Sequence, residues 1–413
     1  MNASILDTID IVVLGRNLQE ARKKRGLTQE DAAKIIQVAR TTMTAIEKGE
    51  RRIKPGELIK LSQAYGRQVS DFVRERPAIQ PFRVQLRGPF ALANEDTDRI
   101  AQPIDELEEL CRNYLELENI TAAPLVRNYP AEYQISGLPP EQAGERIAVQ
   151  ERNRLGLGDG PLSILREILE EDVGLRVFYL PLTPSKFSEI YFYNDELGGC
   201  IAVNSLPPPP REGLPPLPRG GLHPEERRRW SLARGYAHFL ANRYTPVVTA
   251  YEGYERLPGS ERFADSFAQN FLMPTEGLKR RFYDRYLGKG RVTPADLCIL
   301  AHYYGVSVEA LTRRLEDLRL LSSGTWERLR ASEFKIRAAQ QELGLDRIPA
   351  QADKLPQRYQ HLAFRAFHQG LISEGQFARF LSLSRMQSRR AAELLSQNTT
   401  MMLSDVDLDV ALA

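Results

Sequence analysis

The sequence predicts a multidomain, mostly α-helical protein whose middle domain is α+β. The chain has 413 residues, which is enough for two or three domains of ordinary size. Helical patterns dominate its first 76 residues and most of the chain after residue 291. Between these parts, the runs RVFYLPL and IYFYNDELGGCIAVN are rich in β-branched and aromatic residues, and the second contains turn residues. They indicate a small sheet.

Composition favours a soluble, cytoplasmic protein. Hydrophobic residues make up 42% of the chain and charged residues 27%, and no apolar run approaches the roughly 20 residues that span a bilayer. The N-terminus has acids before its first arginine and lacks the apolar run of a signal peptide. Cys111, Cys200 and Cys298 are far apart in sequence and form no C-x-x-C pair, so we expect buried free thiols.

The charge of the first segment is typical of a protein that binds a polyanion. Residues 12–76 hold fifteen lysines and arginines against eight acids, although the whole chain has a net charge of only +2. Because the surplus is concentrated at one end, we expect a polyanion to bind there.

The same segment reads as a set of short helices. A basic amphipathic helix is predicted over residues 14–25 and stops at Gly26. Thr28 has Asp31 three residues later, an acidic variant of the capping box that starts a second helix. A third helix covers residues 40–49, and residues 54–73 supply two more. The inner faces carry small and aliphatic residues: Leu14, Leu18, Ala21, Ala32, Ala33, Ile36, Met43 and Ile46.

A resemblance to the xenobiotic-response-element (XRE) and lambda-repressor helix-turn-helix family is carried by LTQEDAAKIIQVARTTMTAIEKGERRIKPGELIKLSQAYG. Four features of this segment fall at the family's spacing: the initial T-Q, the pair of small residues, the I-E-x-G that ends the third helix, and the final A-x-x-G. The resemblance implies a five-helix lambda-repressor-like domain over residues 1–76, with helix three as the recognition helix. In this family Arg22 and Glu47 occupy positions that often form a structural ion pair. A helical hairpin that binds protein is the alternative.

The resemblance also assigns DNA contacts. We expect the outward residues of the recognition helix to read base edges, with Arg40 best placed for a bidentate contact to guanine. Other polar residues would hold phosphates, which fixes register without reading sequence. The base-reading residues are Arg40, Thr41, Thr44 and Ala45, and the phosphate-binding residues are Gln29, Thr42 and Lys48.

The rest of the chain is divided by composition. Residues 80–98 read as a linker, IDELEELCRNYLELE as a helix, and residues 206–224 as an irregular Pro- and Gly-rich segment. Helices are expected over residues 139–155 and within residues 161–173, before the strand RVFYL. The expected domains are 1–76 for DNA binding, 77–142 for a linker and helical connector, 143–290 for the α+β domain, 291–395 for a C-terminal helical region and 396–413 for a tail.

The middle domain resembles the ImmA/IrrE metallopeptidases from about residue 143 to residue 274. The ordered motifs R-x-x-L-G-L-G-D-G-P, G-L-R-V-F, I-A-V-N and R-R-x-x-L-A-x-x-x-x-H lead to E-R-F-A-D-S-F-A-Q-N-F-L-M-P, the most specific of them. The resemblance implies a zincin-like fold with a small sheet, followed by helices that trail this domain.

The peptidase motif itself is degenerate. Active members carry H-E-x-x-H on a helix, in which two histidines and a downstream acid bind zinc and the glutamate activates water. Here SLARGYAHFL keeps His238, but Arg234 stands at the first histidine and Gly235 at the glutamate. The downstream acid is Glu261, with Asp265 as the alternative. A cation one turn from His238 would repel a metal.

From these residues we expect no metal, no cofactor and no catalytic residue. His238 is expected to be a satisfied helix histidine, and the acid at 261 to pair with Arg234. The sequence therefore predicts a transcriptional regulator that binds an operator in double-stranded DNA as a homodimer, with a pseudopeptidase domain for sensing or assembly and a protein or small-molecule effector. The alternatives are a zinc metallopeptidase that cleaves a repressor, and an antitoxin-like module that binds a partner protein and autoregulates its operon.

Overall fold

The computed structural model divides into two compact units, Met1–Ala78 and Ile79–Ala413, and each is described by itself. The structure describes residues 10–65, 69, 72, 82, 94–206, 225–250, 258–286, 291–332, 334–345, 354–383, 387 and 390. The predicted tail at 396–413 and nearly all of the Pro-rich segment at 206–224 lie outside these residues. In the described part, no helix combines the length and apolar character needed to cross a membrane.

The first unit contains four described helices around one core. They are α1 (Ile11–Lys24), α2 (Gln29–Ile36), α3 (Arg40–Glu47) and α4 (Pro55–Tyr65). Thr28 and Asp31 form the predicted capping box at the start of α2. The predicted inner residues are buried together with Ile53, Leu58, Leu61, Tyr65 and Phe72. Of the helix predicted after α4, which would complete the five, only Val69 and Phe72 are among the described residues.

A glycine sets the close packing of this unit. Gly49 follows α3 with φ +74°, and a Cβ on it would lie 2.8 Å from Cα of Val12 in α1. Only glycine combines this left-handed backbone with so close an approach. The end of α3 is therefore fixed against α1.

The second unit is built on a four-stranded sheet of order β1-β3-β2-β4. Its strands are β1 (Arg176–Leu180), β2 (Phe187–Asn194), β3 (Gly198–Asn204) and β4 (Val247–Ala250). β1 pairs parallel with β3, and β2 pairs antiparallel with β3 and β4. The first three strands were predicted. β4 was not, because VVTA is too short to give a period-2 pattern.

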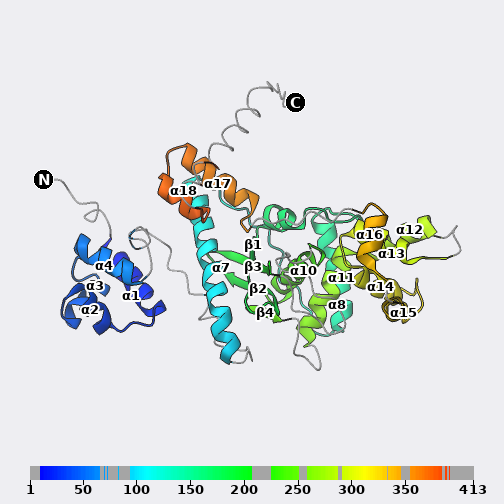
Figure 1. Ribbon diagram of the computed structural model, residues 1–413, viewed down its shortest axis with the longest axis horizontal. Helices are drawn as coiled ribbons and strands as arrows, with labels where there is room; N and C mark the ends of the chain where they lie inside the picture. The colour runs from blue at the N-terminus through cyan, green and yellow to red at the C-terminus, as the bar shows by residue number, and fades with distance from the viewer. Residues whose placement is uncertain are drawn as a thin grey trace, which may run out of the picture. The chain divides into compact units, whose positions relative to one another are not determined.

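Helices cover both faces of the sheet (Figure 1), which explains why every residue of β3 is buried. Ile201 and Val203 belong to the core cluster shared with α8 (Pro140–Arg154), α10 (Glu225–Ala241) and α11 (Gly259–Leu272). The alternate residues Cys200 and Ala202 belong to a second core cluster with α7 (Asn94–Ile120). α7 begins upstream of the predicted helix and contains Pro103. Between β1 and α8 lie a short α9 (Leu165–Glu167) and a π-helical turn, η2 (Ile168–Val173).

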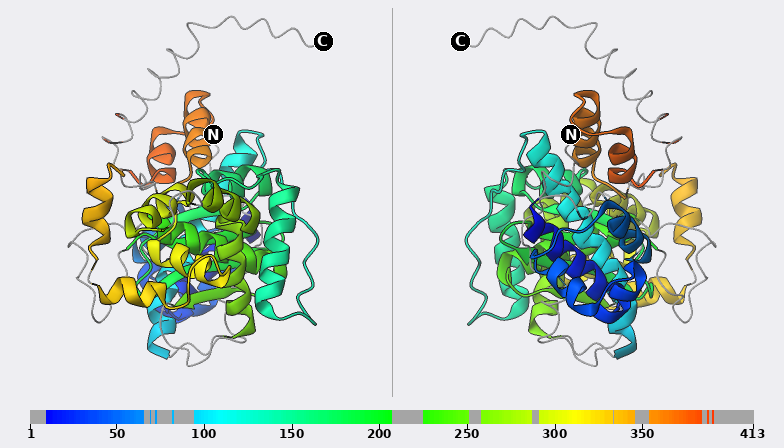
Figure 2. Two further views of the ribbon diagram at one scale, coloured as in Figure 1. Left: turned by 90° about the vertical axis from the view of Figure 1, so that its right-hand side faces the viewer. Right: turned by 90° about the vertical axis from the view of Figure 1, so that its left-hand side faces the viewer.

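The helices after residue 291 divide between the two cores. One group of helices adds to the core cluster that contains α10, and a second group packs with α7. The two groups lie at different ends of the unit (Figures 1 and 2). The first comprises α13 (Pro294–Tyr304), α14 (Val308–Asp317), α15 (Thr325–Ala331) and α16 (Ile336–Glu342), which follow α12 (Thr275–Tyr286). The second comprises α17 (Gln357–His368) and α18 (Glu374–Phe380). The predicted C-terminal region therefore does not have a core of its own among the described residues.

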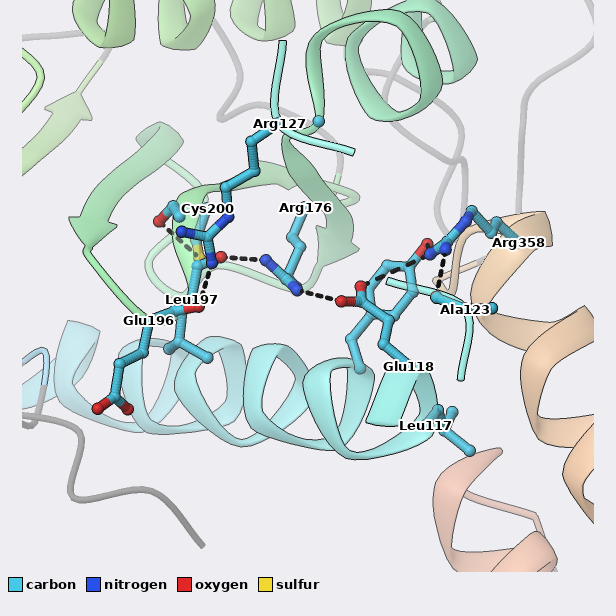
Figure 3. Close-up of polar contacts among 12 residues, drawn as sticks. Leu117, Glu118, Ala123, Arg127, Arg176, Glu196, Leu197, Cys200 and Arg358 are labelled. Carbon is cyan, nitrogen blue, oxygen red and sulfur yellow. Dashed lines mark hydrogen bonds and ion pairs between the residues drawn. The ribbon is translucent and has the colours of Figure 1, made fainter. Parts of the chain in front are cut away.

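A buried ion-pair network connects the sheet, α7 and α17 (Figure 3). Arg176 of β1 donates to Glu118 of α7 over 2.8 Å and to the carbonyl of Leu197. Arg358 of α17 lies 3.5 Å from the other oxygen of Glu118 and donates to the carbonyl of Ala123 over 2.7 Å. Since both carboxylate oxygens of Glu118 face a guanidinium, its buried charge is compensated. All three cysteines are buried and free, as predicted.

Candidate functional site

The predicted recognition helix is anchored by its apolar side. Met43 and Ile46 of α3 are buried, while Arg40 and Thr41 are exposed. Thr42, Thr44 and Ala45 are half-buried, and Lys48 is exposed at the C-cap. The structure thus places the predicted base-reading residues on the accessible part of α3.

The expected ion pair between Arg22 and Glu47 is confirmed. Nε of Arg22 donates to Oε1 of Glu47 over 2.5 Å and its Nη2 donates to Oε2 over 3.0 Å. Burial acts to raise the pKa of Glu47, but hydrogen bonds from Arg22 and Gln29 outweigh it and hold the pKa below its usual value. The pair joins α1 to the end of α3.

Gln29 contributes to this scaffold, a role that the sequence reasoning missed. Its amide nitrogen donates to Oε2 of Glu47 over 2.8 Å, and its oxygen accepts from the hydroxyl of Thr44 over 3.2 Å. Gln29 therefore ties α2 to α3, and its amide group is already engaged within the protein. No pattern of spacing would have indicated this three-helix contact.

In the second unit, α10 lies between the sheet and α11 and carries the degenerate peptidase motif. Arg234 reaches three carboxylates. Nε donates to Oε1 of Glu189 in β2 over 2.9 Å, Nη1 donates to Oδ1 of Asp265, and Nη2 donates to Oε2 of Glu261. The sequence offered Glu261 and Asp265 as alternatives, and the structure brings both to Arg234. Glu189 was missed because it lies in a strand, far away in sequence.

The Arg234 site, by which we mean Arg234, Glu189, Glu261, Asp265 and His238, is largely screened from water. The Arg234 side chain is 11% exposed and that of Glu189 is fully buried. Burial raises the pKa of Glu261 to about 7 against the opposing effect of Arg234. Three carboxylates surround one guanidinium, so a bound proton on Glu261 would relieve excess negative charge.

His238 is buried in the same site. Its Nε2 lies 3.5 Å from Oε1 of Glu261, and neither ring nitrogen has a hydrogen-bond partner within the described ranges. The expectation of a satisfied histidine is therefore wrong. Burial, and then the nearby charge of Arg234, lower the pKa of His238 to about 3. The imidazole is neutral at physiological pH.

Helix packing explains why a glycine, Gly235, stands at the position of the missing glutamate. A Cβ there would lie 3.0 Å from Cγ2 of Ile201, on the β3 strand beneath α10. Helix and sheet consequently approach more closely than a larger residue would allow.

The donor set does not fit a catalytic zinc ion, which takes three protein ligands and water. The guanidinium of Arg234 occupies the carboxylates that a metal would need. Among the described residues, no group of three or more His, Cys, Asp and Glu side chains is arranged to hold a metal.

Comparison with known families gives two matches. Residues 18–72 match the helix-turn-helix family, and residues 221–316 match the IrrE N-terminal-like domain. The second match includes α10, α11 and the helices through α14, while the first three strands lie outside it. No curated protein matches the chain. The two matches support a DNA-binding regulator that joins an XRE-like helix-turn-helix domain to a peptidase-like domain of the ImmA/IrrE type.

Proposed function

We propose that this protein is a sequence-specific transcriptional regulator whose peptidase-like domain is catalytically inactive and serves in sensing or assembly. The observation that carries this proposal is the position of Arg234. Its guanidinium contacts Glu189, Glu261 and Asp265 where an active relative would hold a metal ion. A permanent cation there satisfies the carboxylates without zinc.

Loss of the general base supports the same proposal. Gly235 has no side chain to accept a proton from water, and His238 is buried between an acid and a cation. The remaining carboxylates are engaged by Arg234. None of these groups has both the freedom and the position to activate a water molecule for peptide hydrolysis.

DNA recognition is proposed for the accessible face of α3. Arg40 and Thr41 are exposed and can approach base edges, and Lys48 can neutralise a phosphate. Thr42, Thr44 and Ala45 complete this face. Gln29 is proposed to act at the interface indirectly, because it holds Thr44 and Glu47 in place.

The metal content of the purified full-length protein tests the proposal directly. We expect substoichiometric zinc by elemental analysis after exposure to excess zinc and gel filtration, and no change in the stability of the protein on adding a chelator. One zinc ion per chain, removed by the chelator with loss of stability, would favour the metallopeptidase alternative instead.

A further inference from the structure

A cavity of about 340 Å³ lies against α12 and α13 and shares no lining residue with the Arg234 site. Arg280, Arg281 and Arg285 of α12 contribute to its lining, with Tyr303 and Tyr304 of α13. The volume is at the lower end of the range found for small-molecule sites. Basic and aromatic side chains thus converge on a concave surface.

Asp159 and Gly160, which also line the cavity, belong to a loop that is held firmly. Arg152 of α8, a buried residue, donates to the carbonyls of Gly158 and Gly160 over 2.7 and 2.6 Å. α12 packs directly on this loop, since a Cβ on Gly277 would lie only 2.2 Å from the carbonyl oxygen of Asp159. Backbone contacts therefore fix this part of the cavity wall without a ligand.

The charges of the cavity are only partly compensated. Arg280 lies 3.6 Å from Asp159, which neutralises that pair. Within the part of the chain that the structure describes, neither Arg281 nor Arg285 has a carboxylate within ion-pair distance. These two residues are four apart on one helix and therefore share a face. Asp284 also lines the cavity and leaves a net positive charge on the α12 wall.

One of the two guanidiniums is already oriented. The Cζ atom of Arg281 lies 3.4 Å from the centre of the Tyr303 ring, so the side chain is stacked and has lost much of its freedom. Tyr304, behind it, is buried. A stacked guanidinium keeps its N–H donors available for a phosphate or carboxylate group.

We infer that this cavity binds a small organic phosphate that also carries hydroxyl or amino groups. Arg281 and Arg285 would hold the phosphate, and the Asp284 carboxylate would accept a hydrogen bond from the ligand's polar groups. The inference rests on the sensing role proposed above, for which it names the ligand class. A cavity bounded by a fixed loop suits a small molecule better than a flat polymer surface.

Isothermal titration of the full-length protein with AMP, in a buffer free of phosphate and sulfate, tests the assignment. We expect AMP to bind, adenosine not to bind, and inorganic phosphate to compete with AMP. Arg285→Ala should weaken AMP binding by about tenfold through loss of a charge-assisted contact. Arg285 is exposed, so the variant should keep the stability of the parent protein.

Two further variants distinguish a specific binding site from a nonspecific effect of positive charge. Lys279→Ala removes a cation from the same helix without touching the cavity lining, and it should leave AMP binding unchanged. Asp284→Asn should strengthen binding of inorganic phosphate, because it removes a repelling carboxylate. Equal loss in the lysine and arginine variants would overturn the assignment, as would an unmodified protein that binds neither phosphate compound.

The remaining outcomes distinguish the cavity assignment from the proposal of an inactive domain. If AMP does not bind but Arg285→Ala weakens binding to duplex DNA, α12 contacts nucleic acid and the cavity assignment is wrong. If AMP binds as expected to a protein that holds stoichiometric zinc, the cavity assignment stands and the proposal of an inactive domain fails. The two proposals can therefore fail separately.

Discussion

Nε of Arg234 in α10 donates to Oε1 of Glu189 in β2 over 2.9 Å, so the peptidase-like helix is bonded directly to the sheet on which it packs. The Glu189 side chain is fully buried, and the guanidinium of Arg234 is its ion-pair partner. In a metal-dependent relative, the ion would supply positive charge at the centre of the site. Here a residue of the chain supplies it and also connects α10 to α11 through Glu261 and Asp265.

Arg234→Ala is expected to lower the free energy of unfolding of the second unit by about 3–5 kcal/mol, because it leaves buried carboxylates without a counter-charge. Urea unfolding followed by tryptophan fluorescence measures this, since both tryptophans lie in this unit and Trp230 donates to Asp265 over 3.3 Å.

Arg262→Ala is the matched control for the loss of an arginine. Arg262 pairs with Glu141 at the surface, where the two side chains are 49% and 53% exposed. Its removal should cost about 0–1 kcal/mol. Equal effects of the two substitutions would show that the Arg234 contacts contribute no more than a surface pair.

Arg234→His is expected to create zinc affinity, because it adds an imidazole one turn from His238 beside Glu261 and Asp265. Zinc content after gel filtration measures it, with Arg234→Asn as a control that removes the cation without adding a ligand. A histidine variant as free of zinc as the asparagine variant would show that the remaining side chains are not aimed at one point.

The corresponding double change, Arg234→His with Gly235→Glu, is expected to be less stable than the single one. The new Cβ would approach Cγ2 of Ile201 to 3.0 Å, and the isoleucine side chain must move to admit it. A comparison of the unfolding midpoints of the two variants checks this. Equal midpoints would mean that α10 shifts at no cost.

The sequence predicted those parts of the structure that rest on local patterns. The capping box at Thr28 and the strands β1 to β3 follow from residue type and spacing, and the pairing of Arg234 with an acid followed from the resemblance to the ImmA/IrrE family. Glu189 and Gln29 were missed because neither a local pattern nor the family resemblance assigns these contacts, and a single sequence carries no record of which side chains meet in the fold. The burial of His238 without a hydrogen bond was missed for the same reason.

The pH dependence of stability provides a test of the His238 environment. Its pKa is about 3 in the folded protein and 6.5 is the ordinary value, so the unfolded chain binds a proton first as the pH falls. The contribution of His238 is complete above pH 6.5 and declines below it by about 1.4 kcal/mol per pH unit. The free energy of unfolding of the parent protein, relative to that of His238→Gln, should therefore fall by about 2 kcal/mol when the pH is lowered from 7.5 to 5.0.

Glu261 titrates with the opposite sign, since its folded pKa of about 7 lies above its ordinary value of 4.5 and its contribution is lost as the pH rises. Both proteins retain Glu261, so its own titration contributes to both unfolding free energies and is largely removed from their difference. A difference that stays constant between the two pH values would contradict a buried, neutral histidine.

We also expect the protein to bind its operator as a homodimer. One helix-turn-helix reads only a few base pairs, and a dimer places two recognition helices about one DNA turn, roughly 34 Å, apart. Light scattering of the full-length protein, free and on a complete operator, measures the mass of each species. A single chain per operator in both measurements would exclude the dimer.

The recognition helix can be tested by separating base reading from phosphate binding. A selection from random duplexes first supplies the operator sequence. Arg40→Ala should then lose about 1–3 kcal/mol of discrimination at one base position, because an exposed arginine at the start of α3 can form a bidentate contact to guanine. Lys48→Ala should weaken binding to all sequences alike and reduce the slope of log affinity against log salt by about one.

Lys60→Ala, in the exposed part of α4, is the control and should change neither quantity. If Arg40→Ala kept the operator preference of the parent protein, the reading surface would have to lie elsewhere in this unit.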